Sequence, residues 1–446
     1  MLSSRLPKDL SPSPFFAELE RAKADVLSEC ANPDALSFID MTVSSPVKAG
    51  LPVDLDDAVD EGRKAFVNWS PDASGWKSAR EAVVEYYRER GGNFTAGQII
   101  LTASTSEAYS VLFKTFCDPG DVILTPMPGY PLLDTLAQLE HLECAPYFLK
   151  LKRERFDKLT DLKKVTERRS APAEVNAFRF VLDSDSLLAA PERAKILLLV
   201  SPHNPTGHCI SREEWNAAVR FCEENNMVLV VDEVFGDYAF SDKVSRTWQY
   251  VFGERENVIL DPGVPSAIGE GIWDAGGGDF INLPENGPKC PIFWLNGLSK
   301  AVGSPQLKLG WMAFYAPREN FEEIRAALEF VEDAYLSVSA PAQALGISLL
   351  PKAAAYESKV LDRLQQNWQT LREAFPSKYC PEVLGGWYAV VRLGEDDEEL
   401  TLRLLREKHV LVQPGFFFDF DEDGWVVMSL LQEPALFKEA IDRIIK

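Results

Sequence analysis

Short apolar segments alternate with helical patterns through the middle of this chain, and this alternation restricts the fold more than any other feature. Segments 194–202 (AKILLLVSP) and 227–233 (MVLVVDE) are apolar over most of their length, as strands buried on both faces of a sheet are. The stretch 211–226 between them has a helical pattern, and Ser211 with Glu214 forms the capping box that begins such a helix. Strands are also expected at 98–104 and 121–126, with a helix at 107–116. This order predicts an α/β fold with a mainly parallel sheet covered on both faces.

The last third of the chain has a different pattern. From about Phe321 it begins with long helical patterns and then gives two short strands, GGWYAVVRL (385–393) and GWVVMSLL (424–431). This pattern predicts a separate, smaller α+β domain, and 446 residues are enough for two or three domains. We expect a large domain over 46–320 and a small domain made of 1–45 with 321–446.

Two stretches do not fit the alternation. The first, 152–176, is highly charged and weakly patterned, and it is interpreted as a helix with its loop. The second, about 241–291, is too rich in glycine and proline for regular structure and is interpreted as a long loop insertion. A loop of this length in a compact domain is usually functional or disordered.

Composition excludes several classes of protein. A formal net charge of -22 argues against a nucleic-acid partner, which would require a basic face. Seven cysteines without a CxxC pair and four scattered histidines indicate neither a disulfide framework nor a metal site. The N-terminal segment has no apolar core of a signal peptide, and no apolar run approaches the length of a membrane span. We therefore expect a cytoplasmic protein without a membrane partner.

Polar residues follow the expected strands. They form three groups, at 104–106 (STS), at 203–207 (HNPTG) and at 232–233 (DE). Ligands of such sheets bind at the carboxyl ends of the strands, so these groups are expected to converge on one site. Lys300 stands in turn-forming sequence, after Gly-Leu-Ser, and Lys308 follows eight residues later. Neither lysine has the context of an ordinary solvated helix residue.

These motifs occur in the order STSEA, PMPGYP, SPHNPTG, VVDEVFGDY and LNGLSKAVGSPQLKLGW. This order resembles the aminotransferase class I/II family, the fold-type-I, aspartate-aminotransferase-like enzymes that use pyridoxal 5'-phosphate. The resemblance implies a mainly parallel sheet of the seven-stranded type between helices, with a smaller α+β domain. It also implies an enzyme that moves an amino group between an amino acid or amine and a 2-oxo acid, and a homodimer with sites at the interface.

The resemblance implies a role for four side chains at the cofactor ring. Lys300 matches the lysine that forms the Schiff base and then transfers a proton at the substrate α-carbon, which requires a deprotonated amine. Asp232 matches the carboxylate that pairs with the protonated pyridine nitrogen and keeps the ring an electron sink. Asn204 matches the residue that donates a hydrogen bond to the phenolic oxygen of the cofactor. Tyr130 matches the aromatic residue that stacks on the ring.

A second group is expected to bind the cofactor phosphate. Free N–H groups at a helix N-terminus attract anions, and such a terminus is expected at 104–106. The residues implied are Ser104, Thr105, Ser106, Ser299 and Lys308. Simple helix capping by the serines remains an alternative, because capping and phosphate binding use the same geometry. Lys308 stands where most relatives have an arginine, so positive charge is kept while the two-pronged geometry is lost.

Three further positions depart from the family pattern. Phe235 replaces a tyrosine that hydrogen-bonds the phenolic oxygen, and Trp69 replaces a tyrosine that reaches the phosphate of the neighbouring subunit. Val427 occupies the position of the arginine that binds the substrate carboxylate. Arg392 and the 241–291 insertion are the candidates to replace that arginine, and the insertion is alternatively a lid. A lyase or decarboxylase of the same fold, or a non-catalytic regulator that binds the cofactor, remain alternative functions.

Overall fold

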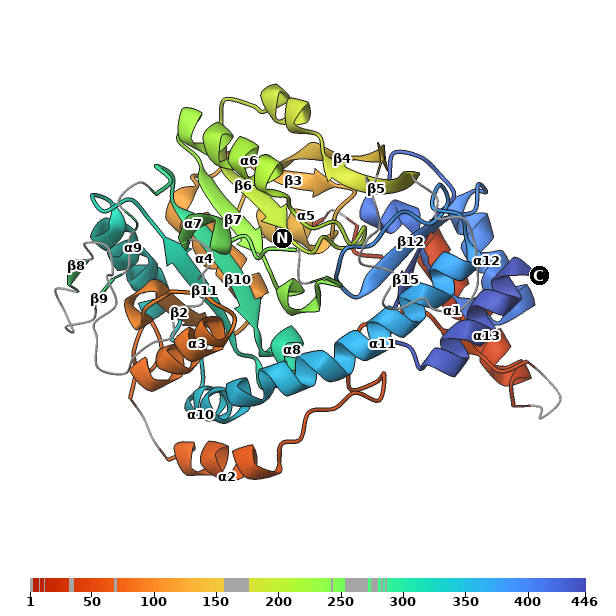
Figure 1. The fold of residues 1–446 in the computed structure, drawn as a ribbon, viewed down its shortest axis with the longest axis horizontal. Helices are drawn as coiled ribbons and strands as arrows, with labels where there is room; N and C mark the ends of the chain where they lie inside the picture. The colour runs from red at the N-terminus through yellow and green to blue at the C-terminus, as the bar shows by residue number, and fades with distance from the viewer. Residues whose placement is uncertain are drawn as a thin grey trace.

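An eight-stranded sheet, counted over the described residues, forms the centre of the molecule (Figure 1). The computed structural model describes residues 3–7, 9–11, 13–31, 36–67, 70–155, 176–241, 244–252, 272–273, 280–281, 284 and 287–446. From one edge to the other, the strands are β2 (Ile99–Thr102), β11 (Gly310–Tyr315), β10 (Ile292–Gly297), β7 (Val228–Asp232), β6 (Ala194–Val200), β3 (Val122–Met127), β4 (Glu143–Arg155) and β5 (Asn176–Leu182). Within this sheet, β11 and β5 run against the direction of the other strands.

The mainly parallel sheet expected from the sequence is confirmed, but it has eight strands instead of seven. The additional strand is β5, which pairs antiparallel with β4 from Leu149↔Leu182 to Arg155↔Asn176. The prediction of a helix at 152–176 is therefore wrong for residues 152–155 and for Asn176, which belong to strands. Residues 156–175 lie outside the described residues. Lys150 and Lys152 are exposed on this edge hairpin, so its charged sequence lacks the apolar pattern by which a buried strand is recognised.

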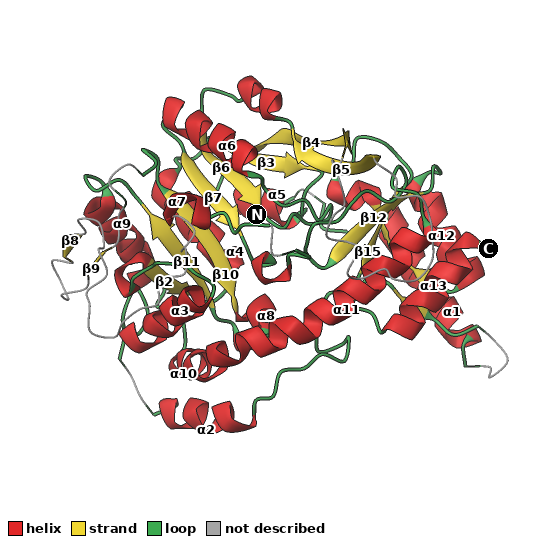
Figure 2. Cartoon of the chain, in the orientation of Figure 1, coloured by secondary structure: helices red, strands yellow, loops and turns green. Residues whose placement is uncertain are grey.

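Helices lie on both faces of the sheet (Figure 2). The helices beside the sheet are α3 (Lys77–Glu89), α4 (Thr105–Phe116), α5 (Leu132–Leu139), α6 (Arg212–Glu224), α7 (Gln249–Phe252), α8 (Leu298–Ala301), α9 (Phe321–Asp333) and α10 (Ala340–Leu349). Helix α2 (Asp56–Ala65) packs on α10. The capping box of α6 is confirmed, since the Ser211 hydroxyl accepts from the Glu214 N–H and the Glu214 carboxylate from the Ser211 N–H. Ile196, Leu198 and Val230 in the central strands are fully buried between the helical layers.

A smaller sheet lies at the C-terminal side of the molecule. Its strands are β12 (Tyr388–Arg392), β15 (Trp425–Ser429) and β14 (Gln413–Pro414), in that order and antiparallel. Around it lie α1 (Pro14–Glu29), α12 (Asp397–Lys408) and α13 (Pro434–Ile445), and β1 (Ile39–Asp40) pairs with β13 (Val410–Leu411). The long helix α11 (Ala353–Ala374) runs from the main sheet to this second sheet (Figure 1). Helices α9 and α10 contact α4 and α3 beside the main sheet.

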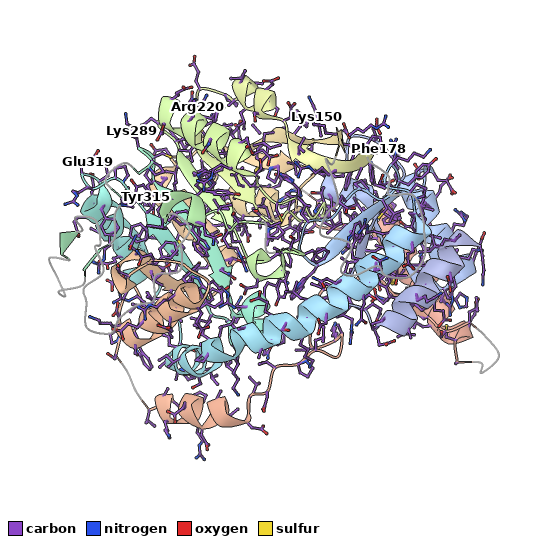
Figure 3. The ribbon with its side chains drawn as sticks, in the orientation of Figure 1. Lys150, Phe178, Arg220, Lys289, Tyr315 and Glu319 are labelled. Atoms are coloured by element: carbon purple, nitrogen blue, oxygen red, sulfur yellow. The ribbon has the colours of Figure 1, made fainter. Side chains whose placement is uncertain are left out.

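The strand that carries the chain toward Lys300 is anchored where it begins. Just before β10, the Lys289 N–H donates to the Glu223 carboxylate at 2.7 Å, and the Tyr315 hydroxyl donates to the Pro288 carbonyl at 2.8 Å (Figure 3). Within the expected insertion the structure describes α7 and the short strands β8 (Ile272–Trp273) and β9 (Phe280–Ile281). Most of the remaining insertion lies outside the described residues.

None of the helices in the described residues combines the length and the apolar character required to cross a membrane.

Candidate active site

The three polar groups expected to converge do lie along one edge of the main sheet. Asp232 ends β7 opposite Leu295 of β10, and its carbonyl accepts from the Ser201 N–H at 3.0 Å. On the other side of β10, Gly297 is paired with Gly310 of β11, and Gly310 is paired with Thr102 of β2. The turns that carry residues 104–106, 203–207 and 298–301 therefore all follow strands that end at this edge.

Lys300 lies in α8, a single helical turn that follows β10 directly. Its side-chain nitrogen lies 4.5 Å from the centroid of the Trp387 ring and 5.3 Å from that of Phe235. Burial among these rings lowers the pKa of Lys300 to about 8, although the nearby Asp232 carboxylate acts in the opposite direction. A substantial fraction of the amine is therefore neutral near neutral pH, as a nucleophile or base requires.

Asp232 has the partners that a buried carboxylate requires. The Tyr109 hydroxyl donates to its Oδ2 at 2.6 Å, and the Val234 N–H donates to its Oδ1 at 3.0 Å. Burial nevertheless raises the pKa of Asp232, while these two hydrogen bonds and Lys300 act to lower it. A cationic group placed against this carboxylate would relieve the cost of its burial.

Asn204 and Tyr130 approach the same edge from two turns. The Asn204 Oδ1 is buried and has no hydrogen-bond partner within the described residues, which is unusual for a buried amide oxygen. Burial raises the pKa of Tyr130, and the negative charge of Asp232 adds to this rise, so the two side chains lie within electrostatic range. The Tyr130 residue is nevertheless 46% exposed.

Ser104 is the N-cap of helix α4, so the capping alternative holds for this one residue. The Ser104 hydroxyl accepts from the Glu107 N–H at 3.2 Å, as an N-cap does. Thr105 and Ser106 stand in the first turn and are partly buried. A Cβ on Gly310 would lie 3.1 Å from the Ser104 carbonyl carbon, so glycine there allows β11 to approach this helix end closely.

The other two residues expected at the phosphate come from the α8 region. Ser299 is partly buried in α8, and Lys308 is exposed in a left-handed backbone conformation after the turn Pro305–Leu307. Because Lys308 is exposed, its ammonium group is in contact with water.

The structure shows the surroundings of the residues that depart from the family pattern, except for Trp69. Phe235 is buried against Trp387, with 5.3 Å between ring centroids, and offers no donor to a ligand. Val427 is fully buried inside the smaller sheet, opposite Val390. Arg392 is ion-paired with Glu422. Trp69 lies outside the described residues.

Three residues of this site were not among those expected. Tyr109 donates to Asp232, Trp387 faces the Lys300 amine, and the Tyr238 hydroxyl donates to the Lys300 carbonyl at 2.6 Å. In the sequence, Tyr238 stands three residues after Phe235. Tyr109 lies in helix α4 and Trp387 directly precedes the apolar strand β12, and their sequence context does not distinguish them from core residues.

The side chains present here fit a pyridoxal phosphate group. Among the described residues the Asp232 carboxylate has no ion-pair partner, and the amine of Lys300 has a lowered pKa. The Asn204 amide, whose Oδ1 has no partner there, also carries an N–H donor. Helix α4 is twelve residues long and begins with hydroxyl side chains. Together these supply a donor or acceptor for a pyridine nitrogen, a phenolic oxygen and a phosphate.

The fold is that of an α/β protein of fold type I, and a lysine with a lowered pKa lies at this edge of its sheet. The family model for aminotransferase class I and II matches residues 54–444, and the chain belongs to this family. Members of the family are pyridoxal-phosphate-dependent enzymes, and the chain is accordingly an aminotransferase.

Individual relatives are distant in sequence but similar over nearly the whole chain. Glutamate-pyruvate aminotransferase of Haemophilus influenzae is 22% identical over 389 residues, which cover 84% of this chain and 81% of the relative. Tyrosine aminotransferase of Mus musculus is 24% identical, with 98% of this chain and 86% of the relative covered. The solved structure of alanine aminotransferase from Pyrococcus furiosus has 20% identity and a TM-score of 0.72, with 98% of both chains covered. Aspartate aminotransferase from Thermotoga maritima, at 19% identity, has a TM-score of 0.71 and covers 100% of this chain and 99% of its own.

Proposed function

We propose that this aminotransferase binds pyridoxal 5'-phosphate at the edge of the main sheet and moves an amino group between an amino acid and a 2-oxo acid there. The observation that carries the proposal is the amine of Lys300, whose pKa burial lowers to about 8, beside the buried carboxylate of Asp232. When bound, the cofactor supplies an electron-withdrawing ring that stabilises negative charge at the substrate α-carbon.

Lys300 is the residue that moves the proton. In its neutral form the Nζ atom accepts a proton from the substrate α-carbon and then returns one, which is general base and acid catalysis by one group. A pKa of about 8 keeps both protonation states accessible near neutral pH. The rings of Trp387 and Phe235 exclude water from one side of the amine, and this exclusion preserves the low pKa.

The other side chains bind and orient. Asp232, kept in place by the Tyr109 hydroxyl, pairs with the protonated ring nitrogen, and Asn204 donates its amide N–H to the phenolic oxygen. Tyr130 covers the ring face. The phosphate is held by the N-terminus of α4 at Ser104, Thr105 and Ser106, together with Ser299 and Lys308.

The proposal extends to the assembly. Fold-type-I enzymes work as homodimers with sites at the interface, and we expect the same here. The division into a large part over 46–320 and a small part of 1–45 with 321–446 stays a prediction, as does a cytoplasmic location. All seven cysteines are free thiols, which suits a reducing compartment.

An absorbance experiment on the purified protein tests the proposal. Pyridoxal phosphate is added, excess is removed, and the visible spectrum is recorded before and after a panel of amino acids without any oxo acid. Loss of the visible band with one class of amino acid, and its return with a 2-oxo acid, is the expected result. A visible band that no α-amino acid changes would favour the lyase or an unusual amine donor. No visible band at all would contradict cofactor binding.

A further inference from the structure

The main-chain carbonyl of Lys300 has a side-chain partner. The helical turn α8 contains only four residues, and a single turn has little stability of its own. The last carbonyls of a helix have no partner within the helix, and Lys300 contributes one of them. The Tyr238 hydroxyl donates to this oxygen at 2.6 Å, and Tyr238 is fully buried. The position of the turn therefore depends on where Tyr238 is held.

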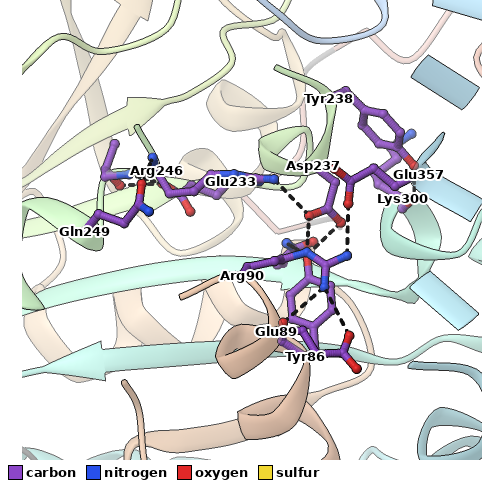
Figure 4. Close-up of polar contacts among 12 residues, drawn as sticks. Tyr86, Glu89, Arg90, Glu233, Asp237, Tyr238, Arg246, Gln249, Lys300 and Glu357 are labelled. Carbon is purple, nitrogen blue, oxygen red and sulfur yellow. Dashed lines mark hydrogen bonds and ion pairs between the residues drawn. The ribbon is translucent and has the colours of Figure 1, made fainter. Parts of the chain in front are cut away.

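Tyr238 is held through its neighbour Asp237, on which three side chains converge (Figure 4). The Asp237 Oδ1 accepts from the Arg90 Nε at 2.9 Å and from the Arg246 Nη2 at 3.2 Å, and its Oδ2 accepts from the Tyr86 hydroxyl at 2.7 Å. Asp237 is 2% exposed, and the two guanidinium groups keep its pKa below the ordinary value against the effect of burial. A carboxylate with this set of donors has one well-defined position.

The same centre also reaches the chain on the other side of Lys300. The Tyr86 hydroxyl, which donates to Asp237, accepts from the Asn296 Nδ2 at 3.1 Å. The Asn296 Oδ1 in turn accepts from the Gly297 N–H at 2.7 Å, at the point where β10 becomes α8. The turn is thus held before Lys300 through Tyr86 and at Lys300 through Tyr238, and both connections lead to Asp237.

The two guanidinium groups of this network also interact with carboxylates other than Asp237. Arg90 also pairs with Glu357 at 3.0 Å, so the two guanidinium groups of Arg90 and Arg246 face the carboxylates of Asp237 and Glu357. Buried ion pairs of this kind seldom add much stability compared with apolar packing, but they fix geometry when every donor is used. A role in positioning Lys300 accounts for a network of this size, because it is hydrogen-bonded to the chain at Lys300 and at Gly297.

We propose that Tyr238 is a positioning residue for Lys300, and that Asp237, with Tyr86, Arg90 and Arg246 around it, fixes Tyr238 and the start of α8. The Tyr238 ring also packs on the Trp387 ring, with 5.1 Å between the ring centroids. Tyr238 therefore contacts both the main chain of Lys300 and the aromatic ring that the Lys300 amine faces. The inference rests on the proposed function only for its catalytic consequence. The placement of the Lys300 amine is a property of the chain itself.

The test measures the amine of Lys300 directly, without substrate. The full-length protein is freed of cofactor with hydroxylamine, labelled by reductive methylation over a range of pH, and analysed at Lys300 by peptide mass spectrometry. The variants are Tyr238→Phe, which removes one hydroxyl, and Tyr86→Phe, which removes the connection between Asp237 and Asn296. The matched control is Tyr147→Phe, because the buried Tyr147 hydroxyl also donates to a main-chain carbonyl, that of Leu198, at 2.9 Å.

In Tyr238→Phe, the midpoint of labelling at Lys300 is expected to move up by roughly one pH unit, since a released amine turns toward water. The labelling rate at pH 7.5 then falls by roughly five- to tenfold, as the neutral fraction does. Tyr86→Phe is expected to move the midpoint in the same direction by less, and Tyr147→Phe to leave it at the wild-type value. The midpoint, unlike the rate alone, does not depend on access of the reagent.

An unchanged midpoint in folded Tyr238→Phe would overturn the proposal. A shift in Tyr238→Phe without one in Tyr86→Phe would overturn the part assigned to the Asp237 network. If the variants show these shifts but no amino acid changes the spectrum of the cofactor-loaded wild-type protein, the proposed transamination fails while the positioning role stands.

Discussion

The side-chain nitrogen of Lys300 lies 4.5 Å from the centroid of the Trp387 ring, although the two residues stand next to strands of different sheets. Lys300 follows β10 of the main sheet, and Trp387 directly precedes β12 of the smaller one. An aromatic face attracts an ammonium group, while the loss of water around it disfavours the charged form. Desolvation dominates here, since the pKa of Lys300 falls to about 8.

The first prediction concerns the pH dependence of stability. Because the folded pKa of Lys300, about 8, lies below its ordinary value of 10.5, burial of the ammonium destabilises the cofactor-free fold below pH 8. Lys300→Met should therefore raise the free energy of unfolding at pH 7 by roughly 1–3 kcal/mol. The difference should shrink as the pH rises from 8 toward 10.5. Urea denaturation at pH 7 and pH 9.5 measures it, and a constant difference would contradict the cause given.

The second prediction concerns the partner of Asp232. Tyr109→Phe removes the hydroxyl that donates to Asp232, so the pKa of this carboxyl should rise further and its hold on a cationic ring weaken. We expect affinity for pyridoxal phosphate to fall roughly tenfold or more, the usual effect of losing a hydrogen bond to a charged group. Titration of the cofactor-free protein by absorbance measures this, with Tyr147→Phe as control. Equal affinity in both variants would show that Tyr109 is only a core residue.

The third prediction concerns Phe235. Without a hydroxyl at this position, the visible absorbance of the cofactor-loaded protein should titrate at a higher pH than in Phe235→Tyr, whose added donor would stabilise the deprotonated form. We expect a difference of roughly one pH unit. The measurement is a spectrophotometric pH titration of both proteins. The idea is abandoned if the two titration midpoints coincide while both proteins bind the cofactor fully.

The fourth prediction concerns the candidate carboxylate binder, Arg392. It lies five residues beyond Trp387 along an extended strand, about 16 Å away, and its guanidinium is already paired with Glu422. Arg392→Gln should therefore change KM for an amino acid by less than about twofold, and stability by less than about 1 kcal/mol, as for other exposed ion pairs. Glu422→Gln is the matched control. A large rise in KM that is confined to carboxylate-bearing substrates would restore Arg392 as the binding residue.

The fifth prediction concerns Glu332, which is 2% exposed at the end of α9. Burial, with the charge of Glu107, raises its pKa from 4.5 to about 8. The folded protein therefore loses stability as the pH rises from 4.5 to 8. Glu332→Gln should be more stable than wild type at pH 8, by roughly 1–3 kcal/mol, and nearly equal to it at pH 5. Thermal unfolding at the two pH values decides the matter, and an equal gain at both would contradict the raised pKa.

Features determined by short stretches of chain could be predicted from the sequence. The central strands β6 and β7 are apolar throughout because both faces are buried, and the Ser211–Glu214 capping box is a contact between near neighbours. Asp232 was expected at a strand end, and the structure places it at the end of β7. These features depend on local chemistry, which the sequence displays directly.

Features that depend on the meeting of distant segments could not be predicted. Tyr109 lies 123 residues from its partner Asp232, and Tyr238 lies 62 residues from Lys300. Nothing in the local pattern distinguishes these tyrosines from core aromatics. The pairing of β4 with β5 was missed for a different reason. The end of β4 that pairs with β5 carries the exposed charged residues Lys150, Lys152 and Arg153, so its sequence lacks the apolar pattern of a buried strand.

Helix α11 has a mechanical consequence. Glu357 stands in its second turn and is bonded to Arg90, while Leu371, fourteen residues later and about 21 Å along the axis, is buried near its other end. The helix also packs on α13 beside the smaller sheet. A rigid helix with contacts at both ends couples them, so a rotation of the smaller sheet is expected to displace the Glu357–Arg90 ion pair near Lys300. The shape of the whole molecule, and not only the lining of its site, thereby enters the reactivity of one amine.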